Sequence, residues 1–415
     1  MKEVDFKLWH PFLAFERGNL SDNSKKVDGN YMKCISAGTL KKKRIEEIDI
    51  IKALGIICMV AGHSSAPFTK FIYLFHMAIF FIASGFFFKD EKSNNIGSVF
   101  KGIFSKIKQL WLPFFVWSTI YVLLHNVFIQ INVYTENPEL LDYVSGSHNH
   151  TIVPYTIIEM VKKIIKGGLF SCGEQMFGAS WFLKVLFMVS VCYLVVNFLA
   201  KKLFKKHVLL VQLLASVLLL ALGYFCSVHK ISAYGFANIV KTASFYCLYF
   251  IGHILGLCKD KYLDWNWKQF VPIFLVSFGL LFCMKNIGSI ALDQNHYENP
   301  LFLLAASLTG WAFLYSMSYF IKLIPGIKEM MLVIGKRTLT VVILHFLSIK
   351  IVEVIVVAYY GMPAFCVAAF PNLYGEKGLW WFAYTVVGVG VPIVANILYH
   401  LVVDRISFGR KKKVV

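Results

Sequence analysis

About ten separate runs of some twenty apolar residues constrain this chain more than any other feature of its sequence. A helix needs about 20 apolar residues to cross the roughly 30 Å hydrocarbon core of a bilayer, so each run has the length of one transmembrane helix. The runs lack the alternation of apolar and polar residues that marks a membrane β-barrel. We therefore predict an all-α polytopic membrane protein with about ten transmembrane helices, at residues 48–66, 70–88, 109–133, 180–200, 207–226, 239–258, 270–290, 301–323, 338–361 and 379–403.

The composition agrees with a chain whose surface largely faces lipid. Hydrophobic residues make up 58% of the chain and charged residues 16%, whereas a soluble globule carries roughly 25% charged residues. The net charge of +19 arises from basic clusters between the apolar runs, where such clusters anchor a topology and contact anionic lipid head groups. A nucleic-acid partner needs a water-exposed basic face with stacking aromatic residues, and we find no such pattern in the sequence.

Basic residues are distributed unevenly among the segments that connect the predicted spans. Thirty-one of the 42 Lys and Arg residues lie in one set of these segments, and basic residues are retained on the cytoplasmic side of a membrane. Both termini are therefore predicted to be cytoplasmic. The cytoplasmic set comprises residues 1–47, 89–108, 201–206, 259–269, 322–337 and 404–415.

This layout predicts one membrane domain at residues 41–405. A polar cytoplasmic tail at 1–40 precedes it, and a basic tail at 406–415 follows it. One long external loop, 134–179, contains an amphipathic stretch at 155–166. Such a stretch is typical of a short helix that lies in the membrane interface.

The first predicted span holds the densest set of ionisable residues, which are costly in a bilayer and often mark a functional site. Asp49 precedes Lys52 by three residues, close enough to pair with it on a helix. The eleven-residue step from Lys52 to His63 leaves the two side chains about 20° apart around the helix and about 16 Å apart along it. We predict that Lys52 and His63 line one common water-accessible crevice.

A second histidine, His76, lies near the outer start of the next span. Because a tight external turn joins the two spans, His63 and His76 are expected at similar depth in the membrane. An imidazole has a pKa near neutrality, which suits proton transfer, so this pair is the leading catalytic candidate. Histidines also link helices through hydrogen bonds, and the sequence leaves that structural role open.

Other polar residues in the spans are weaker candidates. His345 lies in the inner half of the ninth span, where Lys350 and Glu353 are spaced to neutralise one another. Trp181 and Lys184 lie near the external end of the fourth span. A tryptophan marks the membrane interface there, and a lysine side chain extends to it.

Five segments, taken in order, resemble motifs of membrane acyltransferase family 3, in its fucose 4-O-acetylase-like branch. The resemblance covers roughly residues 41–405 and implies a fold with ten spans. The first segment supplies Arg44, Asp49, Lys52 and His63; the others are Phe75-His76-Met77 through Phe86, Lys106 through Pro113, Trp181-Phe182-Leu183, and Gly335-Lys336-Arg337 through His345.

The resemblance implies an O-acyltransferase that moves an acetyl or other short acyl group from acyl-CoA to a hydroxyl of a cell-surface or lipid-linked carbohydrate. It implies a multi-pass protein of a bacterial cell membrane, with acetyl-CoA as the donor substrate. His63 and His76 would be catalytic, whereas Trp181, Lys184 and His345 would be on the acceptor side or structural. The charged groups that would bind or balance the donor are Arg44, Asp49, Lys52, Lys106 and Lys108.

Two positions depart from the family pattern. The family usually has arginine where this chain has Lys52, and an arginine often expected before the third span falls on Gln109. Lysine lacks the planar fork with which arginine binds phosphate through two hydrogen bonds. The departures put in doubt a phosphate clamp of the usual kind.

Functions from other classes remain open at this level. A proton-coupled transporter or glycolipid flippase would use the histidines and the Asp–Lys pair as a proton relay, although the two halves show no matched helix-breaking positions. A non-enzymatic component of a polysaccharide-export complex would hold its histidines for structure alone. The nine cysteines show no C-x-x-C pair and no metal-ligand spacing, so we expect no metal cofactor.

Overall fold

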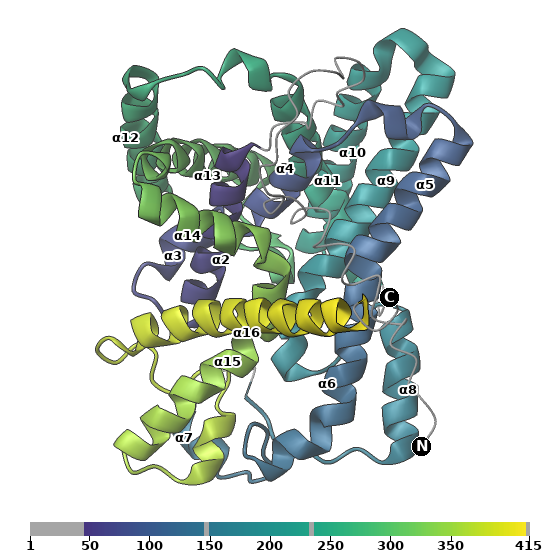
Figure 1. Cartoon of the computed structure of the whole chain (residues 1–415). Helices are drawn as coiled ribbons and strands as arrows, with labels where there is room; N and C mark the ends of the chain where they lie inside the picture. The colour runs from purple at the N-terminus through teal and green to yellow at the C-terminus, as the bar shows by residue number, and fades with distance from the viewer. Residues whose placement is uncertain (1–44, 145–148, 232–235, 412–415) are drawn as a thin grey trace.

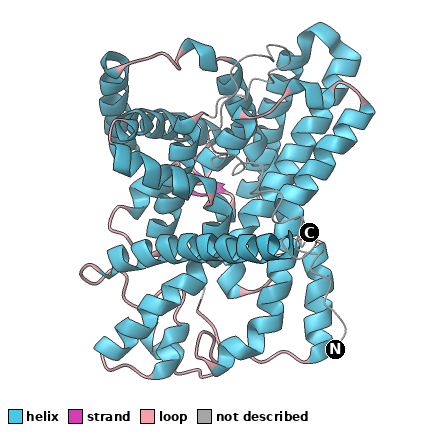
Figure 2. Ribbon diagram, viewed as in Figure 1, coloured by secondary structure: helices cyan, strands magenta, loops and turns pink. Residues whose placement is uncertain are grey.

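A computed structural model describes residues 45–144, 149–231 and 236–411 (Figure 1). Within these residues the chain is helical apart from its connections and one two-stranded hairpin (Figure 2). The longer helices are α2 (Glu46–His63), α4 (Ala78–Phe86), α5 (Ile96–Lys106), α6 (Leu112–Gln130), α8 (Ile157–Gly168), α9 (Trp181–Phe204), α10 (Val208–Val228), α11 (Phe236–Leu257), α12 (Trp267–Met284), α13 (Pro300–Lys322), α14 (Pro325–Lys336), α15 (Thr338–Tyr359) and α16 (Trp380–Lys411).

The shorter elements join these helices. They are α3 (Thr69–Tyr73), α7 (Leu140–Tyr143), the strands β1 (Ile290–Ala291) and β2 (His296–Tyr297), the π-helical turn η3 (Ile107–Trp111), and the 3₁₀ turns η2 (Asp90–Ser93), η4 (Gln175–Ser180), η5 (Lys205–His207), η6 (Lys259–Lys261), η7 (Leu292–Gln294) and η8 (Ala364–Ala368). Arg44 and the predicted tail at 1–40 lie outside the described residues.

The described residues contain eight helical segments that are long and apolar enough to cross a membrane. The predicted class, an all-α polytopic membrane protein, agrees with this result. Two differences explain why eight segments stand against ten predicted spans. One segment, Gln175–Val228, contains both α9 and α10, and its 54 residues are far longer than the about 20 that one crossing needs. The other difference is α2, which meets the length but carries four ionisable residues in its first two turns. The count of ten spans and the side of each terminus stay predictions.

The helix that contains the third predicted span begins earlier than the sequence predicted. Residues 89–108 were expected to form a cytoplasmic connection, but α5 starts at Ile96 and continues through η3 into α6. Asn95 caps the helix by accepting a hydrogen bond from the Ser98 backbone. Ile96, Phe100 and Phe104 are exposed and lie one turn apart on a single face of α5, as a helical pattern requires. The lysines of this stretch interrupt the apolar run, so the sequence did not indicate the helix.

Two further predictions concern the ends of elements. The helix α8 (Ile157–Gly168) forms where a short amphipathic helix was predicted at 155–166, and a capping box of Thr156 and Glu159 starts it. The helix α16 continues to Lys411, past the expected boundary at residue 405, so the predicted basic tail is partly helical.

Glycines allow two central helices to cross with their backbones in contact. A Cβ atom on Gly85 of α4 would lie 2.0 Å from the carbonyl oxygen of Tyr249 in α11, and one on Gly252 would lie 2.0 Å from the carbonyl oxygen of Ile82. Gly256, four residues after Gly252, meets the backbone of Phe86 in the same way. Small residues four apart are typical of close helix crossings in membranes. This crossing fixes α4, and with it the chain that carries His76.

The helix α2 lies inside the bundle. It packs against α13, α14, α15, α16 and α4, while α5, α9, α10 and α11 form a group to one side (Figure 1). The buried residues of α2 include Asp49 as well as Ile48, Ile51 and Ile56. Because neighbouring helices surround α2, its charged residues face protein groups and cavities rather than lipid, as ionisable residues in a membrane protein generally do.

Candidate active site

The helix α2 carries its acidic residues where its own dipole favours them. Glu46, Glu47 and Asp49 lie in the first turns, and His63 lies in the last turn. Acidic groups are stabilised near a helix N-terminus and cationic groups near the C-terminus. The same helix therefore presents a carboxylate–ammonium pair at one end and an imidazole at the other.

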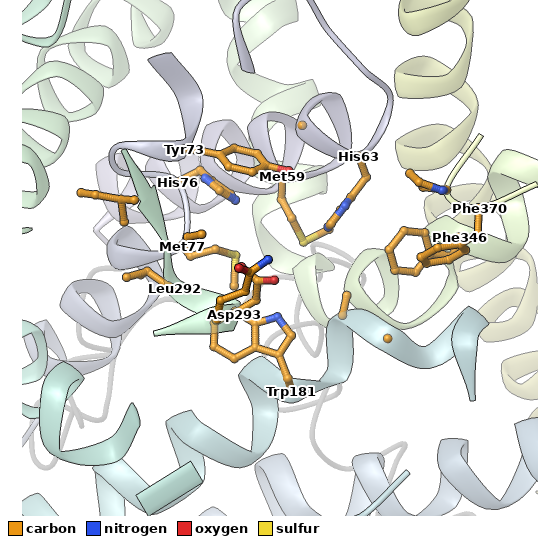
Figure 3. Close-up of a pocket in the computed structure, with 17 residues that line it drawn as sticks. Met59, His63, Tyr73, His76, Met77, Trp181, Leu292, Asp293, Phe346 and Phe370 are labelled. Atoms are coloured by element: carbon orange, nitrogen blue, oxygen red, sulfur yellow. The ribbon is translucent and has the colours of Figure 1, made fainter. Parts of the chain in front are cut away.

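His63 and His76 line one cavity of about 480 Å³. Its wall includes Met59 and Tyr73, together with Trp181 at the start of α9 (Figure 3). Both histidines predicted from the sequence to lie at similar depth thus face the same space. A cavity of this size is in the range of small-molecule sites, which are about 300–1,000 Å³ and mostly apolar with a few polar groups.

The His63 ring packs against two residues of α15. The centre of the His63 ring lies 5.5 Å from that of His345, in a stacked arrangement, and 4.8 Å from that of Phe346. The backbone carbonyl of His63 accepts a hydrogen bond of 2.7 Å from the side-chain amide of Asn372. These contacts fix both the backbone and the ring of His63 at the edge of the cavity.

His345 lies directly behind His63 and is fully buried. Its Nδ1 atom is 2.9 Å from the carbonyl oxygen of Val341. A carbonyl only accepts hydrogen bonds, so Nδ1 is the donor. Nε2 of His345 has no hydrogen-bond partner among the described residues. His345 therefore supports the His63 ring and is not among the residues that line the cavity.

His76 lies in the turn between α3 and α4, where the helical backbone of the second span is broken. Its Nδ1 atom donates a hydrogen bond of 3.1 Å to the carbonyl oxygen of Ile72, so a neutral His76 offers the lone pair of Nε2 as an acceptor. The ring of Tyr73 packs on the imidazole at 4.8 Å between centres. Gly62 leaves room for that tyrosine, because a Cβ atom at Gly62 would lie 2.5 Å from the Tyr73 ring.

Two further segments complete the cavity, and the sequence interpretation missed both. The hairpin between α12 and α13 contributes Asp293 and Gln294, and the loop before α16 contributes Phe370 and Pro371. The polar run Asp293-Gln294-Asn295, between two apolar runs, indicates a turn. Nothing in the local sequence indicates that this turn folds back over the histidines.

Buried charges of α15 hold the second of these segments. The Lys350 ammonium donates a hydrogen bond of 2.9 Å to the carbonyl oxygen of Val367 and another to that of Ala369. The Glu353 carboxylate accepts a hydrogen bond of 2.8 Å from the backbone of Leu373. The sequence suggested that Lys350 and Glu353 neutralise one another. In the fold, both groups form hydrogen bonds to the loop that forms a wall of the cavity.

A second cavity, of about 390 Å³, lies at the opposite end of α2. Three lysines line it: Lys52 of α2, Lys92 of η2 and Lys106 of α5. Lys52 also forms an ion pair of 2.8 Å with Asp49, as the sequence predicted. We call this space the lysine cavity and the first one the histidine cavity. The expectation that Lys52 and His63 line a single crevice is wrong, since each lines its own cavity.

Lys92 was not predicted, because it lies in a short polar connection with no regular pattern. Its turn is fixed to α9, where the side-chain amide of Asn197 donates hydrogen bonds to Asp90 at 2.9 Å and to Ser93 at 2.7 Å. The adjacent His253 ring, followed by Asn197, holds the pKa of Asp90 at about 2, below its ordinary value. Burial, with Lys89 nearby, lowers the pKa of Lys92. The cavity thus brings together positive charges that repel one another, and a bound anion would reduce this repulsion.

The remaining predicted residues separate into those at the cavities and those away from them. Gln109 lines the lysine cavity and donates to the Ser105 hydroxyl at 2.9 Å, whereas Lys108 is exposed, with its ammonium 4.6 Å from the centre of the Phe104 ring. Trp181 lines the histidine cavity. Lys184 donates instead to the carbonyl oxygen of Phe170 at 3.4 Å.

A family model described as an acyltransferase domain, that of acyltransferase family 3, matches residues 45–400. The chain belongs to this family. The match includes both cavities and the helices that surround α2, of which α16 is covered up to residue 400. This multi-pass membrane protein is therefore an acyltransferase, and acyltransferase chemistry implies a donor and an acceptor of the acyl group.

Other comparisons add no closer relative. No curated protein matches the chain. No solved structure matches it. Among the described residues, no group of three or more His, Cys, Asp or Glu side chains is arranged to hold a metal ion.

Proposed function

We propose that this protein is an integral-membrane O-acyltransferase of the cell membrane. It moves an acetyl or other short acyl group from acyl-CoA to a hydroxyl of a cell-surface or lipid-linked carbohydrate. The observation that carries the proposal is the arrangement on α2, which presents Lys52 in the lysine cavity and His63 in the histidine cavity. One helix thus connects an anion-binding site with a site for proton transfer.

The lysine cavity is suited to the phosphates of the CoA donor. Lys52, Lys92 and Lys106 come from three different elements and surround one space. Ammonium groups bind phosphate as point charges, so three converging lysines replace the bidentate arginine that the family pattern led us to expect. Asp49 holds Lys52 through its ion pair and leaves the cavity with a net positive charge.

The histidine cavity is suited to the acceptor hydroxyl. In the proposed reaction, His63 removes the hydroxyl proton while the oxygen attacks the thioester carbonyl carbon. The tetrahedral intermediate then expels the CoA thiolate as the carbon–sulfur bond breaks, and the thiolate takes the proton from His63. The products are an ester and free CoA. The hydroxyl has only one proton, which His63 takes, so His76 acts on the oxyanion instead. It donates from Nε2 to the developing negative charge, which requires a second proton on that ring.

A stripe of side chains leads along α2 from one cavity to the other. Gly55 and Met59 lie between Lys52 and His63 on the same face of the helix. The Phe80 ring covers Gly55, because a Cβ atom there would lie 3.3 Å from the ring. The distance of about 16 Å between the ends is comparable to the length of an extended pantetheine arm. The donor arm reaches His63 along this stripe when the Phe80 ring swings aside.

Replacement of His63 tests the proposal directly. Purified protein in lipid nanodiscs is incubated with labelled acetyl-CoA and a panel of glycosides, and labelled ester and free thiol are measured. A histidine base contributes about 10²–10⁴ in rate, so His63→Ala should lose transfer by at least that factor. His207→Ala is the matched control, because His207 lies in the exposed turn between α9 and α10. Undiminished transfer by His63→Ala would refute the assignment.

A further inference from the structure

Among the described residues that line the histidine cavity, one is acidic, Asp293. Its carboxylate points into the cavity above the Trp181 ring (Figure 3). The neighbouring Gln294 lines the same space, and the side chains of both residues are exposed rather than packed into the core. No role in the proposed proton transfer requires either group.

The hairpin that carries Asp293 is fixed to the bundle. Ile290 pairs with Tyr297 across the two short strands, and the Tyr297 hydroxyl donates a hydrogen bond of 3.0 Å to Ser244 of α11. The Ser227 hydroxyl of α10 donates a hydrogen bond of 2.6 Å to the carbonyl oxygen of Asn295. The anchors give Asp293 a defined position relative to His63 and His76.

The groups around Asp293 determine which acceptor fits. A carboxylate accepts hydrogen bonds from hydroxyls, and the Gln294 amide both donates and accepts. Trp181 adds an aromatic surface, and the Lys241 ammonium lies 5.3 Å from the centre of its ring and holds the indole in place. A single alcohol in the cavity would occupy the histidines and leave Asp293 unused. A ring with several hydroxyls satisfies both sides at once.

We propose that Asp293 binds the acceptor by accepting a hydrogen bond from a hydroxyl next to the one that is acylated. Asp293 thereby orients a polyhydroxylated ring so that the reacting hydroxyl meets His63. The inference rests on the proposed function, because it assumes that a carbohydrate hydroxyl reacts in this cavity. It makes Asp293 a specificity-determining residue on a hairpin far in sequence from the histidines.

Binding in the absence of donor tests this inference apart from the reaction. The probes are methyl hexopyranosides and their single-deoxy forms, with affinity measured by saturation-transfer NMR on protein in nanodiscs. Asp293→Asn should weaken binding of the preferred glycoside by up to roughly 100-fold, the full loss of a hydrogen bond to a charged group, because the Asn oxygen accepts only an uncharged hydrogen bond. The loss should disappear for the one deoxy form that lacks the hydroxyl bound by Asp293. Asp142→Asn, in the exposed helix α7, is the control and should bind like wild type.

Kinetics separate this inference from the proposed function. Asp293→Asn should raise the acceptor KM and leave the acetyl-CoA KM unchanged. Equal binding by Asp293→Asn and wild type would overturn the inference, as would a failure of wild type to bind any glycoside. Binding that depends on Asp293 without any acyl transfer would refute the proposed function, and with it the assignment of the bound hydroxyl as the neighbour of an acylated one. Transfer whose acceptor KM does not depend on Asp293 would support the proposed function and refute the inference alone.

Discussion

A single methyl group at Gly335 should disable the lysine cavity. Gly335 lies near the end of α14 where that helix crosses the start of α2, and a Cβ atom there would lie 2.0 Å from the carbonyl oxygen of Asp49. Real Cβ atoms essentially never come closer than 3.0 Å to such an atom, so Gly335→Ala must separate the two backbones by about 1 Å. Misplacement by about 1 Å can cost about 10²-fold in rate. We expect a loss of this size, expressed mainly as a higher KM for acetyl-CoA because Asp49 holds Lys52.

The same helix supplies a matched control. Gly326, near the start of α14, has no atom within 4 Å of its Cβ position, so Gly326→Ala should be silent or slightly stabilising. Both variants are assayed for transfer with labelled acetyl-CoA and for thermal unfolding, where overpacking at Gly335 should cost about 1–3 kcal/mol. If Gly335→Ala remains folded and has the wild-type KM for acetyl-CoA, the link from α14 through Asp49 to donor binding is wrong.

Two more substitutions test the geometry at other points. Gly62→Ala should push away the Tyr73 ring that packs on His76. The acceptor KM should therefore rise while the acetyl-CoA KM stays the same. A change in the acetyl-CoA KM alone would contradict the proposed role of His76. Asp90 has its pKa lowered from 3.8 to about 2, so its ionised form stabilises the fold above about pH 4 and loses this effect as pH falls toward 2. The melting temperature of Asp90→Asn should therefore fall less than that of wild type over this range in a pH series of thermal unfolding. An unchanged pH profile would argue against the Asp90 contacts.

The sequence correctly predicted the relative positions of residues that lie on one continuous helix. The spacing of Asp49, Lys52 and His63 indicated an ion pair and a shared helical face, and α2 has both. His76 was also expected near His63, because a short turn joins their spans. Helical periodicity carries this information directly. The single crevice was wrong because the Phe80 ring, which belongs to another helix, covers the middle of that face.

The parts that could not be predicted come from distant segments with no pattern of their own. Lys92 lies in a polar turn, and Asp293 lies in a hairpin that tertiary hydrogen bonds to α10 and α11 place over the histidines. His345 was a candidate by virtue of its motif, but only the fold shows that it supports the His63 ring from behind. A single sequence records which residues are polar and does not record which of them meet in space.

The aromatic cover over Gly55 also bears on how such a protein keeps its membrane sealed. A passage wide enough for an acyl arm would, if it stood open, let protons and small ions leak across the bilayer between turnovers. If the donor arm passes along α2 as proposed, the Phe80 ring that lies on Gly55 would close that path with an apolar group between turnovers and move only while the arm fills the gap. Acyl transfer and the barrier to ion leakage would then depend on the same two residues, Gly55 and Phe80.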